Sequence, residues 1–162
     1  ASEPFAAAGR RAVRKALRRL RRRGREIGGL ADAADLHALR IRGKRLRYVL
    51  EVIEPVGGSP CRALIEHVVA LQDALGTFND ATVAAAELRR YRDGLERGSA
   101  DAAAISHLAD LEIRHAGAAE AGFRRAWKRF TGKRAKRAAK KLLARLEERG
   151  ALREAAPSAD PA

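Results

Sequence analysis

Apolar residues recur along this chain at intervals of three and four positions, the spacing that places side chains on one face of an α-helix. The first helix is expected to begin after Ser2, with Pro4 in its first turn, and to end at Gly28-Gly29. Its apolar stripe consists of Val13, Leu17, Leu20 and Ile27.

A second helix can be capped by Asp32 or Asp35. It is expected to end at Glu54, because Pro55 and Gly57-Gly58 follow. Its apolar residues fall within an arc of about 100° in helical projection. They are Leu36, Leu39, Leu46, Leu50 and Ile53.

Further helices are expected over residues 60–75, 77–98, 99–130 and 133–149. The first begins at Ser59-Pro60 and is broken or kinked at Gly76, with a new cap in residues 77–80. Ser99 opens the third, and Gly132 precedes the last. Residues 151–162 are expected to form a disordered tail, which leaves one helical domain over residues 1–150.

The fold class predicted by this pattern is all-α, of the antiparallel four-helix-bundle type with long helices and an extra C-terminal helix. No stretch alternates apolar and polar residues as a strand does, and aromatic residues make up only 4% of the chain. No uncharged apolar run reaches the roughly 18 residues that suggest a membrane span. Cys61 is the only cysteine, which excludes an intramolecular disulfide and a cysteine-based zinc site. With no apolar segment of a secretory signal at its start, a cytoplasmic protein is expected.

The net charge of +14 is distributed unevenly. Residues 1–50 carry +11 and residues 121–162 carry +9, whereas residues 51–120 between them carry −6. Basic helices on both sides of an acidic middle suggest a polyanionic partner.

Two rows of cations flank the apolar stripes in helical projection. The second helix carries His37, Arg40, Lys44 and Arg47. The first helix carries Arg14, Arg18, Arg21 and Arg25, whereas Arg19, Arg22 and Arg23 are interpreted as ordinary surface. Like charges one turn apart repel one another unless an anion lies across them. If the two stripes share one core, the rows can border a common groove; the alternative is that they are merely solvated faces of Arg-rich helices.

Two segments resemble the CHAD domains, the conserved-histidine α-helical domains. Residues 36–51 read LHALRIRGKRLRYVLE, and residues 71–81 read LQDALGTFNDA. With the preceding basic helix and the helix that ends at Trp127 and Phe130, the resemblance extends over roughly residues 10–130.

The resemblance implies half of a pseudo-symmetric double helical bundle around a basic channel. It also implies binding of inorganic polyphosphate in the cytoplasm, in association with polyphosphate granules. The binding residues that it implies are Arg14, Arg18, Arg21, His37, Arg40, Lys44 and Arg47. Candidate supporting residues are Arg45, Tyr48, Asp80 and Lys128.

The chain departs from the family pattern in one respect. Members of the family carry the His-x-x-Arg motif twice, whereas this sequence carries it once and is most similar to the C-terminal half. Either the chain is a minimal member of the family or a fragment whose missing N-terminal half completes the channel, or two copies pair as a homodimer.

Nucleic acid is the main alternative ligand, because phosphate contacts alone also bind DNA and RNA. An acidic protein or an acidic membrane surface is a further alternative partner. The scattered aromatic residues and the lack of a reader motif favour polyphosphate. The sequence contains no Walker-type phosphate loop, no His-Glu-x-x-His and no Glu-x-Glu-x-Lys motif. We therefore expect a protein that is not an enzyme and that needs no metal or other cofactor.

Overall fold

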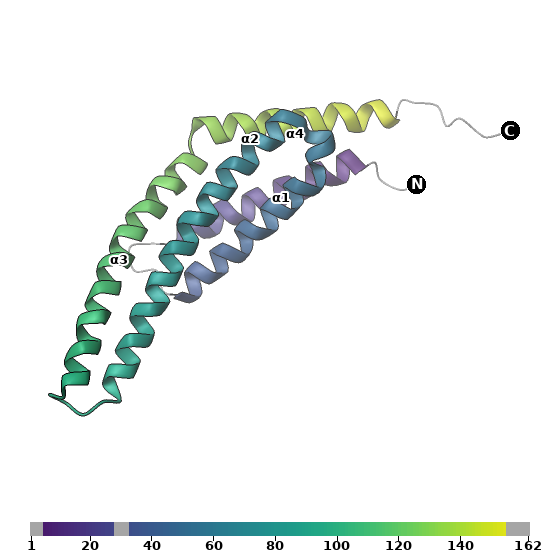
Figure 1. Cartoon of the computed structure of the whole chain (residues 1–162). Coiled ribbons are helices and arrows are strands. Elements are labelled where there is room, and N and C mark those ends of the chain that lie inside the picture. Colours follow the sequence, from purple (N-terminus) through teal and green to yellow (C-terminus); the bar gives the residue numbers. More distant parts are fainter. Residues whose placement is uncertain (1–4, 28–32, 155–162) are drawn as a thin grey trace.

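The computed structural model describes residues 5–27 and 33–154, most of which are helical (Figure 1). The elements are α1 (Phe5–Glu26), α2 (Ala33–Asp93), α3 (Ala100–Phe130) and α4 (Lys133–Glu154). No strand occurs in the described part of the chain, which confirms the predicted all-α class. The starts of the first two helices are predicted partly from residues that lie outside the described part of the chain, namely Ser2, Pro4 and Asp32.

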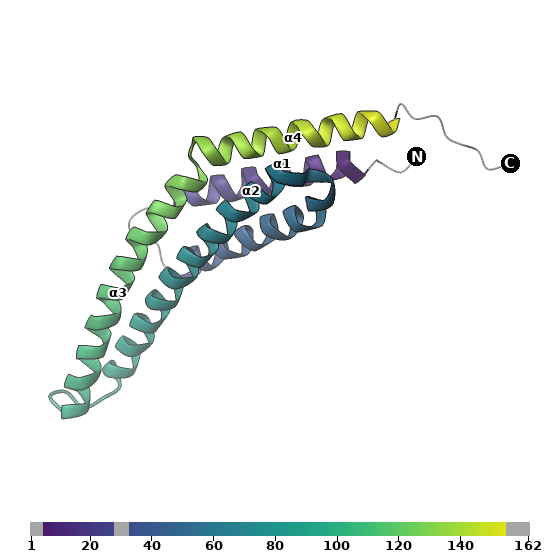
Figure 2. The same cartoon turned by 45° about the horizontal axis from the view of Figure 1, so that its top comes forward.

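The long element α2 is a helical hairpin, because helical conformation breaks at Gly58, where φ is 62° and ψ is −147° (Figures 1 and 2). This backbone region is open to glycine and strained for other residues. The first limb of α2, residues 33–57, therefore turns into a second limb, residues 59–93, that runs back alongside it. The prediction that the helix ends at Glu54 is wrong: Pro55 lies within the helix, and the break falls at Gly58.

Helix α4 packs against this turn. Nε of Arg145 donates a hydrogen bond to the backbone oxygen of Val56 at 3.1 Å, and its guanidinium lies over Gly58. Leu142 is fully buried next to Gly57, where a Cβ would come within 2.9 Å of its Cδ1. The last helix thus supports the turn between the two limbs of α2.

The predicted break at Gly76 is also wrong, since the second limb continues through it as regular helix. Leu75 and Phe78 on either side are buried, and their packing outweighs the cost of about 1 kcal/mol that a mid-helix glycine carries. Thr77 caps no helix; its Oγ1 donates to the backbone oxygen of Asp73 at 3.1 Å.

The predictions for the last two helices are largely confirmed. Ser99 caps α3, because its Oγ accepts a hydrogen bond from the backbone nitrogen of Ala102 at 3.1 Å. Gly132 separates α3 from α4. Helix α4 continues to Glu154, beyond the predicted end at residue 149, and residues 155–162 of the expected tail lie outside the described residues.

Helix α1 lies between the first limb of α2 and α4. Helix α4 runs antiparallel to it, so the start of α1 lies beside the end of α4 (Figures 1 and 2). Helix α3 pairs with the second limb of α2, and the tip of this hairpin, residues 94–99, extends away from the other helices. The predicted apolar stripes form the core between the helices. Its fully buried members include Val13, Leu20, Leu39, Leu46, Leu50 and Leu146.

Aromatic rings connect the second limb of α2 to α3 and α1. Ring centroids lie 6.0 Å apart for Phe78 and Phe123, 6.3 Å for Phe123 and Trp127, and 5.7 Å for Trp127 and Phe130. On α1, Gly24 faces the indole so closely that a Cβ would lie 2.0 Å from Cη2 of Trp127. The missing side chain at residue 24 therefore lets α1 pack directly on α3.

Candidate anion-binding site

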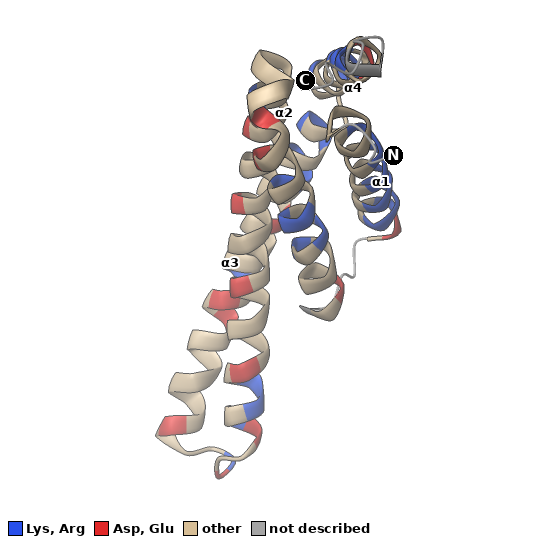
Figure 3. Ribbon diagram, turned by 90° about the vertical axis from the view of Figure 1, so that its right-hand side faces the viewer, with Lys and Arg blue, Asp and Glu red and all other residues tan. Residues whose placement is uncertain are grey.

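Lys and Arg residues gather on α1 and on the first limb of α2 (Figure 3). Glu26, in the last turn, is the only acidic residue of α1. Arginine and lysine are good helix formers, so the apolar stripe of α1 can be combined with a cationic exposed surface without loss of helicity. The helix that packs against each side of α1 then determines which of its cations can contact the same ligand.

The predicted row on α1 borders α4 and the end of α3. On this flank, Arg10 forms an ion pair of 2.9 Å with Glu147 of α4. Further along, the guanidinium of Arg21 lies over the ring of Phe130, 5.8 Å from its centroid. The exposed members of the row between these two contacts are Arg14 and Arg18.

The predicted row on α2 borders the second limb of the same helix. Gly43 lies there against Gln72, and a Cβ added at residue 43 would lie 3.4 Å from Cγ of Gln72. Nε of Arg47 donates to Oε1 of Glu51 at 2.6 Å, and this hydrogen bond and the charge of Glu51 raise the pKa of Arg47. The carboxylate thus offsets part of the positive charge of the row. Of its other members, Arg40 is half-buried, and His37 and Lys44 are exposed.

The two rows therefore do not line one groove, which corrects the prediction that they border a common one. Helical projection identifies the residues that flank an apolar stripe, but it does not say which flank meets which neighbour. Here the flank of α1 that faces the first limb of α2 is the other one. It carries Lys15 and Arg19.

A groove of about 350 Å³ lies between α1 and the first limb of α2, and we call it the α1–α2 groove. Its polar lining consists of Lys15, Arg19, Arg42, Arg45 and Tyr48. Ala12, Ala16 and Val49 complete the lining, and no acidic residue of the described chain belongs to it. Nε of Arg42 is buried and has no hydrogen-bond partner among the described residues. The charged side chains of the lining are thus all cationic, and no carboxylate opposes them.

Sequence reasoning placed Arg45 and Tyr48 only as supporting residues, and it missed Lys15, Arg19 and Arg42. The signal that could have found them is the pairing of Ala12 and Ala16 with cations one turn away. Small residues at helical spacing let a neighbouring helix approach, and the long side chains beside them then border the contact.

The other two supporting candidates lie elsewhere. Asp80 is exposed in the middle of the second limb of α2, where its Oδ1 accepts a hydrogen bond from Nδ2 of Asn79 at 3.3 Å. Lys128 is exposed on α3. Neither residue lines the α1–α2 groove.

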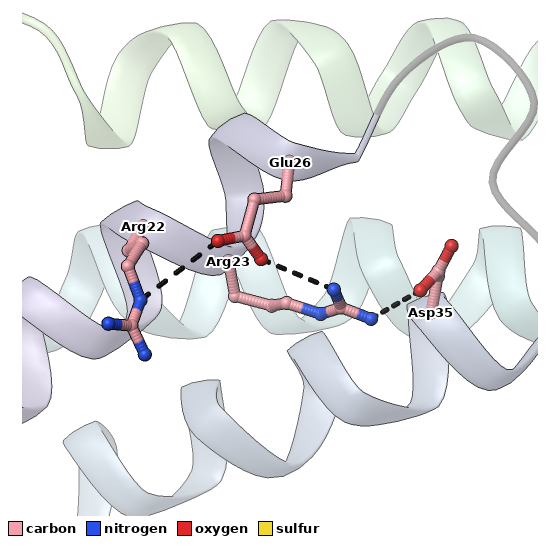
Figure 4. Close-up of polar contacts among 4 residues, drawn as sticks. All are labelled: Arg22, Arg23, Glu26 and Asp35. Carbon is pink, nitrogen blue, oxygen red and sulfur yellow. Dashed lines mark hydrogen bonds and ion pairs between the residues drawn. The ribbon is translucent and has the colours of Figure 1, made fainter.

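Arg23 joins the end of α1 to the start of α2 (Figure 4). It forms ion pairs with Glu26 at 3.2 Å and with Asp35 across the helix connection, while Arg22 approaches Glu26 at 4.0 Å. These carboxylates are engaged at the end of the helix pair and lie outside the groove lining. The contact of Arg23 with Asp35 links the two helices that form the groove.

Within residues 5–27 and 33–154, no group of three or more His, Cys, Asp and Glu side chains is arranged to hold a metal ion. In the same ranges, no helix combines the length and the apolar character needed to cross a membrane.

In a comparison with protein-family models, the model of the CHAD domain matches residues 1–89. The matched residues include α1, the first limb of α2 and most of its second limb, and therefore both walls of the α1–α2 groove. The match ends before α3 and α4, so it is shorter than the expected span of residues 10–130. No curated protein and no solved structure matches the chain at a significant level.

Proposed function

The chain belongs to the CHAD-domain family, and on this premise we propose that it binds inorganic polyphosphate in the α1–α2 groove without transforming it. The observation that carries the proposal is a groove between two helices of the matched region whose charged lining residues are all cationic. The family resemblance suggests the ligand, and the contacts in this chain suggest the place.

The lining suits a phosphate polymer because arginine and lysine offer complementary contacts. A guanidinium presents a planar fork of donors that fits two oxygens of one phosphoryl group, whereas an ammonium is a mobile point charge. Arg19 and Arg45 lie on opposite walls, and Arg42 adds a third guanidinium to the lining.

The aromatic residues favour polyphosphate over single-stranded nucleic acid. Binders of single strands stack bases on aromatic side chains. Here Phe78, Phe123, Trp127 and Phe130 contact one another within the structure, and Tyr48 is the aromatic residue of the groove lining. A polymer without bases needs no such platform.

Non-catalytic binding is the simplest chemistry for this lining. Hydrolysis of a phosphoanhydride needs a group that activates water, commonly a carboxylate or a bound metal ion. The groove lining consists of cations, a phenol and small apolar side chains. Such a set can hold a phosphate chain but offers no general base for water at neutral pH.

The proposal is tested by titrating long-chain polyphosphate into the wild-type protein and into Arg19→Ala/Arg45→Ala. Both side chains are exposed, one on each wall, so their removal should leave the core intact. Hydrogen bonds to charged groups contribute about 1.5–3 kcal/mol, so we expect affinity to fall by about tenfold or more for each residue removed.

The matched control is Arg89→Ala/Arg97→Ala, which removes the same charge near the tip of the α2–α3 hairpin, where both residues are exposed. It should bind almost as tightly as the wild type. Equal losses in the two double variants would show that only net charge matters and would refute the groove. Displacement of polyphosphate by DNA at equal phosphate concentration would refute the assignment of the ligand.

A further inference from the structure

The opposite flank of α1 meets α4, a helix that the family match does not include. Two contacts fix how these antiparallel helices align. A Cβ at Gly150 would lie 3.7 Å from the Cβ of Ala7, and Arg10 pairs with Glu147 at 2.9 Å. Both contacts lie near the start of α1 and the end of α4.

From these contacts toward the start of α4, the facing flanks are cationic. On α1, residues 14, 18 and 21 follow Arg10 at intervals of four, four and three positions and therefore lie on its side of the helix. On α4, Lys140 and Lys136 precede Glu147 by seven and eleven positions and lie on its side. We call Arg14, Arg18, Arg21, Lys136 and Lys140 the α1–α4 strip.

Arg21 is the most enclosed member of the strip. Its Nε and Nη2 are buried, and neither has a hydrogen-bond partner among the described residues. Its guanidinium lies over the face of Phe130. Burial and the nearby charge of Arg25 lower the pKa of Arg21. The guanidinium still carries its charge at neutral pH, and a partly buried charge is stabilised by a nearby counter-charge, so the site favours an anion.

We propose that the α1–α4 strip is a second phosphate-binding site, in which Arg21 anchors one phosphoryl group and Lys136 and Lys140 hold the next from across the helix pair. The identity of the ligand rests on the proposed function, whereas the location rests on the α1–α4 contacts alone. Helix α4 is then part of the binding surface. Because the groove and the strip lie on opposite flanks of α1, a short polyphosphate occupies them separately and a long one can occupy both.

The experiment is calorimetric titration of the full chain with tripolyphosphate, with the fluorescence of Trp127 recorded in parallel. Trp127 is the only tryptophan; it contacts Gly24 and also Phe130, the ring that Arg21 covers, and it is not part of the groove lining. We expect the wild type to bind two molecules and to change its emission. Long-chain polyphosphate should bind more tightly, by a factor on the order of 100, because its second contact is intramolecular.

The test variant is Lys136→Ala/Lys140→Ala, because both side chains are exposed and their loss should leave the fold intact. It should bind one tripolyphosphate and lose the Trp127 response, whereas Arg19→Ala/Arg45→Ala should bind one and keep the response. Arg89→Ala/Arg97→Ala is again the control and should behave as the wild type.

Failure of this inference can be distinguished from failure of the proposed function. If Lys136→Ala/Lys140→Ala keeps the wild-type stoichiometry and the Trp127 response, the strip is not a site, even if the groove is. If Arg19→Ala/Arg45→Ala binds as the wild type while Lys136→Ala/Lys140→Ala loses binding, the groove is refuted and the strip is supported.

Discussion

Replacing Gly24 with alanine tests how closely α1 packs on α3. The new Cβ would lie 2.0 Å from Cη2 of Trp127 and 2.4 Å from Cζ2 and Cζ3. Ordinary contact begins at 3.4 Å, so the indole or α1 would have to move by about 1.4 Å. The indole contacts Phe123 and Phe130, with centroids at 6.3 and 5.7 Å, so a shift of the ring disturbs both aromatic contacts.

The expected magnitude follows from two opposing effects. Overpacking a buried contact costs about 1–3 kcal/mol, and the depth of this overlap places Gly24→Ala near the upper end. Alanine in place of a helical glycine recovers about 1 kcal/mol. We therefore expect the free energy of unfolding to fall by about 2 kcal/mol. In contrast, Gly76→Ala, whose Cβ meets nothing within 4 Å, should raise it by about 0.5–1 kcal/mol.

Urea unfolding followed by far-ultraviolet circular dichroism measures both variants. The two differ from the wild type by the same methyl group in a helix, so the opposite signs isolate the contact with Trp127. In a double-mutant cycle, Gly24→Ala should lower the free energy of unfolding less in the Trp127→Leu background than in the wild type, because the two residues are in contact. The packing argument is refuted if Gly24→Ala is as stable as Gly76→Ala.

Two further predictions concern Cys61 and Ser99. Burial raises the pKa of the Cys61 thiol to about 11 from 9.0, so unfolding releases its proton above pH 9, and stability should fall as pH rises from there through about 11. Cys61→Ala should remove this part of the alkaline loss in urea titrations, and an unchanged pH profile would contradict the assignment. Ser99→Ala removes the cap of α3 and should lower the urea midpoint by an amount equivalent to about 1 kcal/mol; no change would show that the cap contributes nothing.

Features that depend on neighbours in the sequence could be predicted well. The cap at Ser99 needs only the backbone nitrogen of Ala102, three positions on. The burial of Val13 and Leu20 follows from their helical spacing on a helix whose other positions are mostly charged. Such features depend only on residues a few positions apart, so they can be predicted from the local sequence.

Features that depend on distant contacts could not be predicted. A glycine at residue 76 suggests a break, but packing of Leu75 and Phe78 keeps the helix continuous. The prediction of a shared groove failed for a related reason. Arg14 and Lys15 lie on opposite flanks of one helix, and the position of α4 decides which flank is left to face α2. Nothing within residues 1–50 specifies where α4 lies.

The contact of α4 with the turn at Gly58 affects which part of the chain is needed for the matched helices to fold. Family similarity ends at residue 89, yet Arg145 binds the backbone oxygen of Val56, and Leu142 is buried against Gly57. Phe130 at the end of α3 likewise covers Arg21. A fragment cut at residue 89 would expose these surfaces to water. The contacts that support the matched helices therefore extend beyond the region of family similarity.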